Sequence, residues 1–140
     1  MGDCMKATAT FSVKKWDENT YAQISPTVKM TKATVEYALT GELEGTAFEE
    51  CLMFYGHFDE KDQHNSTAAY IGLLRFEGKL NGRTGSFVMK DDGKFEGGSA
   101  DSSLTILKGS GTSDLKSITG TGMYRANKEG VRLELEYEMG

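Results

Sequence analysis

The fold is decided by residues 72–122, which read GLLRFEGKLNGRTGSFVMKDDGKFEGGSADSSLTILKGSGTSDLKSITGTG. Glycine interrupts short runs in which apolar and polar residues alternate, and the whole chain holds 17 glycines and one proline. Asn81-Gly82 and Asp92-Gly93 are pairs that suit tight hairpins, because both residues of such a pair tolerate a positive φ. The pattern predicts an antiparallel all-β structure.

Apolar residues recur with a period of two almost throughout the chain, which is typical of strands rather than helices. Gly97-Gly98 predicts a bulge or a sharp bend inside a strand. The polar residues 17–30 predict a long connection, with room for a short turn of helix. We expect eight strands, at about residues 6–16, 31–40, 46–55, 68–78, 83–90, 94–108, 117–126 and 131–139.

Eight strands in one short chain are best accommodated by a closed sheet. Closure removes the exposed edges at which sheets otherwise aggregate. We therefore predict a single domain over residues 1–140, folded as a closed antiparallel eight-stranded β-barrel.

Composition excludes several classes of partner. The net charge is −5 and no basic patch stands out, so we expect no nucleic acid partner. No apolar segment is long enough to span a membrane, and the N-terminus has no signal-peptide core, so a cytoplasmic location is expected. Two cysteines do not form a disulfide framework, and Cys51 reads as a buried free thiol.

One predicted hairpin is apolar on both faces. Residues 48–55 (FEECLMFY) become apolar on both sides after Glu50, and residues 70–76 (YIGLLRF) are so until Arg75. Such an outer face is usually covered. Either residues 17–30 or a neighbouring subunit would cover it, and we favour a homo-oligomer.

Several short motifs together resemble a bacterial family catalogued as domain of unknown function 3224. The resemblance extends from about Ala7 to Tyr137. Each motif alone is weak, whereas the set in this order is fairly specific. The motifs are residues 7–14 (ATATFSVK) with Trp16, residues 70–73 (YIGL), 75–78 (RFEG), 82–88 (GRTGSFV) and 109–112 (GSGT), followed by Leu115, Ile118, Gly120 and Gly122.

This resemblance implies a barrel similar to that of allene oxide cyclase, and it supplies no function. Family members often carry Glu where this chain has Leu74, and a Gln-His pair where it has Lys90-Asp91. Glu50 matches a position at which the family tends to have Glu. Any activity carried over from allene oxide cyclase or from dirigent proteins would rest on fold analogy alone.

The candidate site is a carboxylate on an apolar barrel wall, where its pKa would be raised. Glu50 shares a face with Phe54, and Asp91 shares one with Phe87; the alternative is that each carboxylate lies at a strand end and meets water. Tyr70 and Tyr137 present hydroxyls from apolar faces, or are core aromatics. The candidate lining residues are Glu50, Phe54, Tyr70, Phe87, Asp91 and Tyr137.

No motif indicates a metal or a cofactor. His57 and His64 flank acidic residues, but they lie in a polar loop without a rigid scaffold, so a solvated loop is the better interpretation. We expect neither a metal nor a cofactor.

Three hypotheses of function follow. The first is a protein that binds a small apolar or amphipathic ligand in the barrel. The second is a cofactor-independent cyclase or isomerase with Glu50 or Asp91 as the acid–base group. The third is a structural oligomer with a filled barrel. An open interior with a dry carboxylate would favour the enzyme, and a purely apolar open interior the binder.

Overall fold

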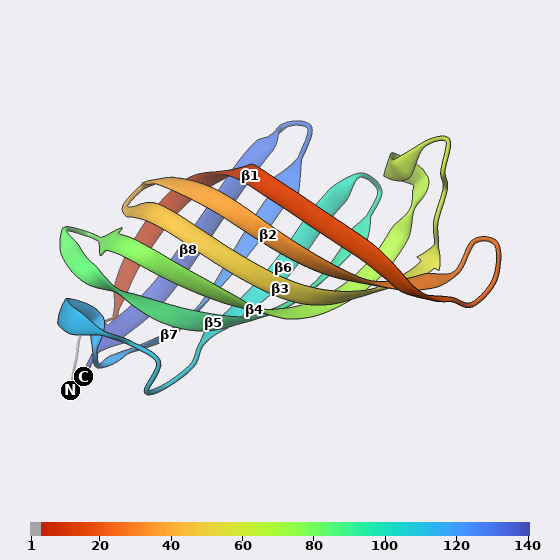
Figure 1. Ribbon diagram of the computed structural model, residues 1–140. Helices are drawn as coiled ribbons and strands as arrows, with labels where there is room; N and C mark the ends of the chain where they lie inside the picture. Colours follow the sequence, from red (N-terminus) through yellow and green to blue (C-terminus); the bar gives the residue numbers. More distant parts are fainter. Residues whose placement is uncertain (1–3) are drawn as a thin grey trace.

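Eight antiparallel strands form a ring in which each strand pairs with the next along the chain (Figure 1). The computed structural model describes residues 4–140. β1 also pairs with β8 over Met5–Ala9, which joins the first strand to the last. The strands are β1 (Met5–Gln23), β2 (Lys29–Gly41), β3 (Leu43–His57), β4 (Thr67–Leu80), β5 (Arg83–Glu96), β6 (Ser99–Ile106), β7 (Ile118–Asn127) and β8 (Gly130–Met139).

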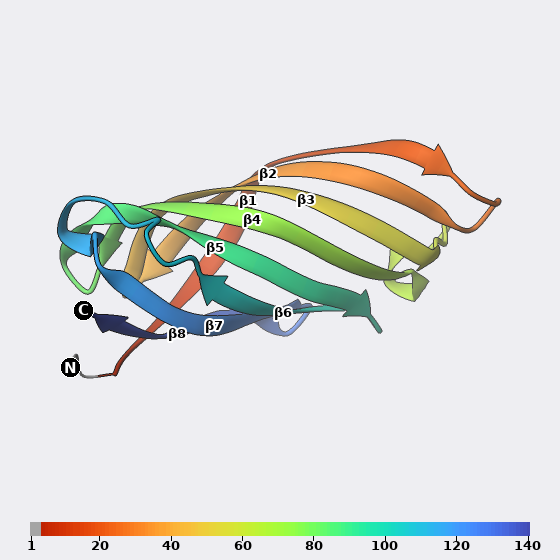
Figure 2. The same ribbon diagram turned by 90° about the horizontal axis from the view of Figure 1, so that it is seen from below.

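Two short 3₁₀ helices lie at opposite ends of the ring. η2 (Ser113–Leu115) lies near the C-terminus, and η1 (Gln63–Asn65) lies in the loop between β3 and β4 at the far end (Figure 1). Seen from below, β1 to β4 extend well beyond the shorter β6 to β8 (Figure 2). No helix formed by residues 4–140 is long and apolar enough to cross a membrane.

The interior is filled at the end that holds η2. Leu115 of η2 is fully buried there, and the rings of Phe76 and Phe87 pack with centroids 5.3 Å apart. Tyr137 is buried in the same cluster, and its hydroxyl accepts a hydrogen bond from Asn81 Nδ2 at 2.7 Å. Close packing of this half leaves the other half of the interior to form a site.

Residues 17–30 are mostly strand, and the expected long connection is wrong. β1 runs on to Gln23, and only residues 24–28 turn before β2 begins. Lys14 is an extra residue in the ladder, because Val13 pairs with Tyr37 while Lys15 pairs with Glu36. This bulge reverses the alternation, so the period of two that identified the first half of β1 does not carry through to its second half.

Asp92-Gly93 does not form a hairpin, which corrects the second turn prediction. Gly93 lies within β5, and a Cβ atom there would lie 2.6 Å from the Tyr70 ring and 2.5 Å from Ser102 Oγ. Glycine is needed at this position so that the Tyr70 ring can lie against the strand. The turn comes at Gly97-Gly98, which have φ of 61° and 78°, instead of a bend within one strand.

The other turn prediction is confirmed. Asn81 and Gly82 have φ of 48° and 84° and join β4 to β5. The strict alternation of β8 is also as predicted, with Leu133, Leu135 and Tyr137 buried.

The apolar outer face of β3 and β4 is uncovered within the chain. Residues 17–30 do not fold over it, as one alternative had expected, because they extend β1 and β2. The large apolar side chains of this face are 43–54% exposed; they are Phe48, Leu52, Phe54, Ile71 and Leu73.

Candidate functional site

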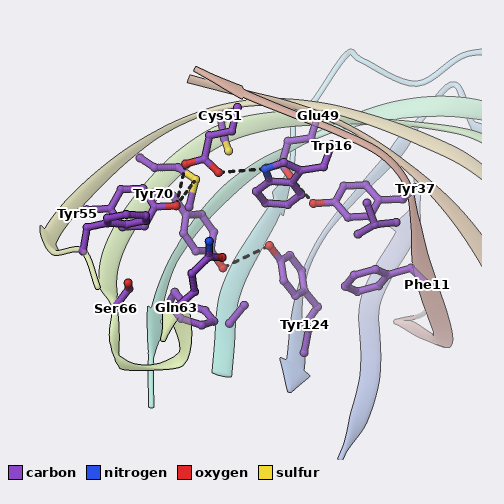
Figure 3. Close-up of a pocket in the computed structure, with 17 residues that line it drawn as sticks. Phe11, Trp16, Tyr37, Glu49, Cys51, Tyr55, Gln63, Ser66, Tyr70 and Tyr124 are labelled. Carbon is purple, nitrogen blue, oxygen red and sulfur yellow. Dashed lines mark hydrogen bonds between the residues drawn. The ribbon is translucent and has the colours of Figure 1, made fainter. Parts of the chain in front are cut away.

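The unfilled half of the ring holds a cavity of about 450 Å³. Eight of its 17 lining residues are aromatic, and seven of these come from strands on several sides of the ring (Figure 3). Phe58, Gln63 and Ser66 of the β3–β4 loop also line it, so this loop reaches the open end. The arrangement is an aromatic chamber closed at one end by the core.

Two buried carboxyl groups lie at the inner end of the chamber. Glu49 is 3% exposed and Asp91 is fully buried. The Tyr37 hydroxyl donates to Glu49 Oε1 at 3.1 Å, and the Tyr124 hydroxyl donates to Asp91 Oδ2 at 3.1 Å. Figure 3 shows the Tyr37 hydroxyl pointing toward the Glu49 carboxyl group, with a dashed line marking their hydrogen bond.

The two carboxyl groups form one hydrogen-bonded unit. Glu49 Oε2 and Asp91 Oδ1 have no other partner within residues 4–140, and the two groups are within hydrogen-bonding reach of each other. Burial, reinforced by the hydrogen bond to Asp91 and by its charge, raises the pKa of Glu49 to about 9. A proton held by Glu49 removes one of the two buried charges and gives the pair a hydrogen-bond donor.

A chain of hydroxyl groups extends from this pair. The Tyr124 hydroxyl donates its one hydrogen to Asp91, so its oxygen accepts a hydrogen bond from the Tyr70 hydroxyl at 3.3 Å. The Tyr70 oxygen in turn accepts a hydrogen bond from the Ser102 hydroxyl at 2.5 Å. Burial raises the pKa of Tyr70 to about 12 and that of Tyr124 further. The hydroxyl groups therefore stay protonated, and each of these hydrogens is engaged in a hydrogen bond within the chain.

A third carboxyl group, that of Glu18, lies at the opening. It accepts hydrogen bonds from Trp16 Nε1 at 3.0 Å, from Thr31 Oγ1 at 2.7 Å and from the Tyr55 hydroxyl at 2.7 Å. Trp16 and Glu18 face inward only because of the Lys14 bulge. The opening therefore has one fixed carboxyl group among aromatic rings.

The six residues predicted to line the cavity lie in different parts of the structure. Tyr70 lines the cavity and Asp91 lies behind its inner wall. Phe87 and Tyr137 belong to the filled half, so neither lines the cavity. Glu50 and Phe54 do share a face, but it is the outer one, which corrects their assignment to the lining.

Sequence reasoning missed Glu49, although a signal for it exists. In the first half of β3, Leu43 and Ala47 are apolar while Glu44 and Thr46 are polar, and continuing this alternation turns Glu49 inward. The apolar residues after Glu50 on both faces hid that choice. Tyr37 and Tyr124 carried no comparable signal, because only the ring brings them to the carboxyl pair.

Cys51 is a buried free thiol, as predicted. It lines the cavity, and burial, with the nearby carboxyl groups, raises the pKa of the thiol to about 12. A thiol in this state is a poor nucleophile. His57 and His64 are exposed, and residues 4–140 contain no group of three or more side chains placed to hold a metal ion.

The fold and the cavity together define a small all-β protein whose ring of antiparallel strands is half filled. The chain belongs to the family described as "Protein of unknown function (DUF3224)", whose model matches residues 7–137. It is similar to the crystal structure of a protein of unknown function from that family in Shewanella oneidensis MR-1. The two share 25% sequence identity with a TM-score of 0.80 over 99% of this chain and 98% of the other. Comparison with curated proteins gave no match.

Proposed function

We propose that the protein binds one small apolar or amphipathic molecule in the cavity. The observation that carries the proposal is the 450 Å³ aromatic chamber, which lies within the usual size range of ligand pockets of about 300–1,000 Å³. Apolar walls would bury the body of the ligand, and the hydroxyl groups of Tyr37, Tyr70 and Tyr124 would orient a polar group. A completely filled interior, as in the structural-oligomer hypothesis, is incompatible with this cavity.

Trp16 provides the test, because it is the only tryptophan and it lines the cavity. Titration with small amphipathic compounds should change its fluorescence and saturate at one molecule per chain. Ala100 also lines the cavity, so Ala100→Phe should abolish binding by filling it. Ala69→Phe, an equal change at an exposed position of β4, should leave binding intact. Equal binding by both variants would overturn the proposal.

A second candidate function is cofactor-independent isomerisation, and the Glu49–Asp91 pair is the observation that favours it. Glu49, the member of the pair that lines the cavity, would pass its proton to Asp91 and take a proton from a carbon next to a carbonyl group of the ligand. The Tyr70 hydroxyl, whose bond to Tyr124 is 3.3 Å long, would turn its hydrogen to the carbonyl oxygen of the ligand. The same proton would return to a different carbon, so that nothing is consumed.

Solvent exchange tests this second candidate. Incubation of protein and an enolisable carbonyl ligand in heavy water should place deuterium in the ligand, and Glu49→Gln should slow that exchange. Binding without any exchange would exclude the enzyme and leave the binding protein.

We further infer that the ring is a closed barrel of the allene oxide cyclase type, supported by the β1–β8 pairing and by the motifs quoted above.

A further inference from the structure

The cavity is acidic and has no basic group in its wall. Glu18 lies at the opening and Glu49 at the inner end, and none of the described lining residues is Lys, Arg or His. An anionic ligand would meet the Glu18 carboxyl group at the opening, and no basic residue of the lining would offset that charge.

The aromatic rings at the opening are arranged in a way that suits a cation. Trp16 and Tyr55 both donate to Glu18, and the Phe58 ring meets the Tyr55 ring edge-on with centroids 5.4 Å apart. The Lys29 ammonium lies 3.5 Å from the Phe58 centroid and 5.4 Å from the Tyr55 centroid. These ring faces therefore already accept an ammonium group, and the faces of aromatic rings attract cations.

Glu18 retains the capacity to bind a ligand. Its Oε1 accepts only the Trp16 bond, whereas Oε2 accepts the bonds from Thr31 and Tyr55. A carboxylate oxygen can accept two hydrogen bonds, so Oε1 has room for one more donor. The three existing bonds hold the carboxyl group in place before any ligand arrives.

From these observations we infer that the ligand is an organic cation with an apolar body. Its ammonium group lies beside Glu18, among the rings of Trp16, Tyr55 and Phe58, and its hydrocarbon portion fills the chamber. This inference rests on the proposed function, since it specifies the class of molecule that the cavity takes. The Lys29 ammonium lies at the same rings and repels this head group.

A matched series of ligands tests the inference. Octylammonium, octanol and octanoate share one chain and differ in the charge of the head group, and the octylammonium N–H groups can donate to Glu18 Oε1. Binding is followed at pH 7 by Trp16 fluorescence and by calorimetry. We expect the cation to bind about tenfold more tightly than octanol, and octanoate to bind most weakly. Lys29→Gln should tighten the cation further and weaken octanoate.

Glu18→Gln should remove the preference for the cation while octanol still binds. Glu50→Gln is the matched control, because it makes the same change on the outer face. Equal affinities, or tighter binding of octanoate, would overturn the inference and leave the proposed function standing. A preference that survives in Glu18→Gln would overturn the placement of the head group. If none of the three compounds binds, the proposed function fails as well.

Discussion

Glu49 is a buried carboxyl group with a raised pKa, and its protonation is therefore linked to the stability of the fold. Its pKa rises from an ordinary value of 4.5 to about 9 in the folded chain. Between these values the folded chain holds a proton that the unfolded chain releases. Stability from this group is complete below pH 4.5 and is lost as the pH rises toward 9, by at most about 1.4 kcal/mol per pH unit.

Glu49→Gln should therefore flatten the dependence of stability on pH. The amide is neutral at every pH and can still donate to Asp91, so the variant should fold. Urea denaturation between pH 5 and pH 9 measures the effect. Glu50→Gln, on the exposed face, should keep the wild-type slope; identical slopes in the wild type and Glu49→Gln would contradict the assignment of the proton.

Gly93 makes a second prediction at this scale. A methyl group there would overlap the Tyr70 ring and Ser102 Oγ, so Gly93→Ala should displace the Tyr70 hydroxyl from its hydrogen bonds. We expect a loss of about 1–3 kcal/mol in unfolding free energy, as is usual for overpacking. Gly56→Ala is the control, because its nearest atom would be 3.6 Å away. Thermal denaturation of both variants decides the point, and equal losses would refute it.

At the scale of the element, the bulge in β1 sets which residues face the cavity. Deleting Lys14 would leave Val13 paired with Tyr37 and Lys15 paired with Glu36, a regular ladder with Trp16 and Glu18 still inward. We expect this deletion to fold and to keep the Trp16 response to ligand. Deleting Glu134 instead, in β8, whose ladders with β1 and β7 contain no bulge to absorb the loss, shifts the register and should unfold the chain. Circular dichroism measures whether each deletion variant folds, and Trp16 fluorescence measures its response to ligand. If both variants behaved alike, the assigned register of β1 would be wrong.

At the scale of the whole molecule, the uncovered outer face suggests self-association. In the ladder Lys32, Leu52, Ile71 and Asp92 lie in one row across four strands. A two-fold axis parallel to the strands, between β3 and β4, would set Lys32 of one copy against Asp92 of the other, and Leu52 against Ile71. We propose a face-to-face dimer, because this patch complements itself in both charge and apolar character.

Analytical ultracentrifugation over a range of concentrations tests the dimer. Leu52→Glu would place a charge in the centre of the patch and should shift the equilibrium to monomer. Met123→Glu is the control, because Met123 is 46% exposed on β7, away from the patch. A wild-type chain that stays monomeric at all concentrations, or equal effects of both variants, would exclude this interface.

Much of the fold could be predicted from local chemistry. The eight strands, the Asn81-Gly82 turn and the buried residues of β8 follow from alternation and turn preference. The second half of β1 could not be predicted, because one extra residue at Lys14 reverses the alternation there. Gly93 was read as a turn residue, because the Tyr70 ring that requires it comes from another strand.

The candidate site was less accessible to sequence reasoning. Tyr70 and Asp91 were named, but Glu50 was chosen over its neighbour Glu49. A shift of one residue moves a side chain from one face of a strand to the other, and β3 is apolar on both faces after Glu50. Local pattern alone thus gave the right kind of residue on the wrong side of the wall.

The sequence by itself determined the all-β class, the number of strands and the residue types available for a site. The periods of alternation and the φ preferences of glycine and asparagine are local properties, so a sequence carries them directly. Only the tertiary structure decided which end of the ring is filled and that Glu49, Asp91, Tyr37 and Tyr124 meet. Those contacts join residues from β2, β3, β5 and β7, and closure of the ring is what brings them together.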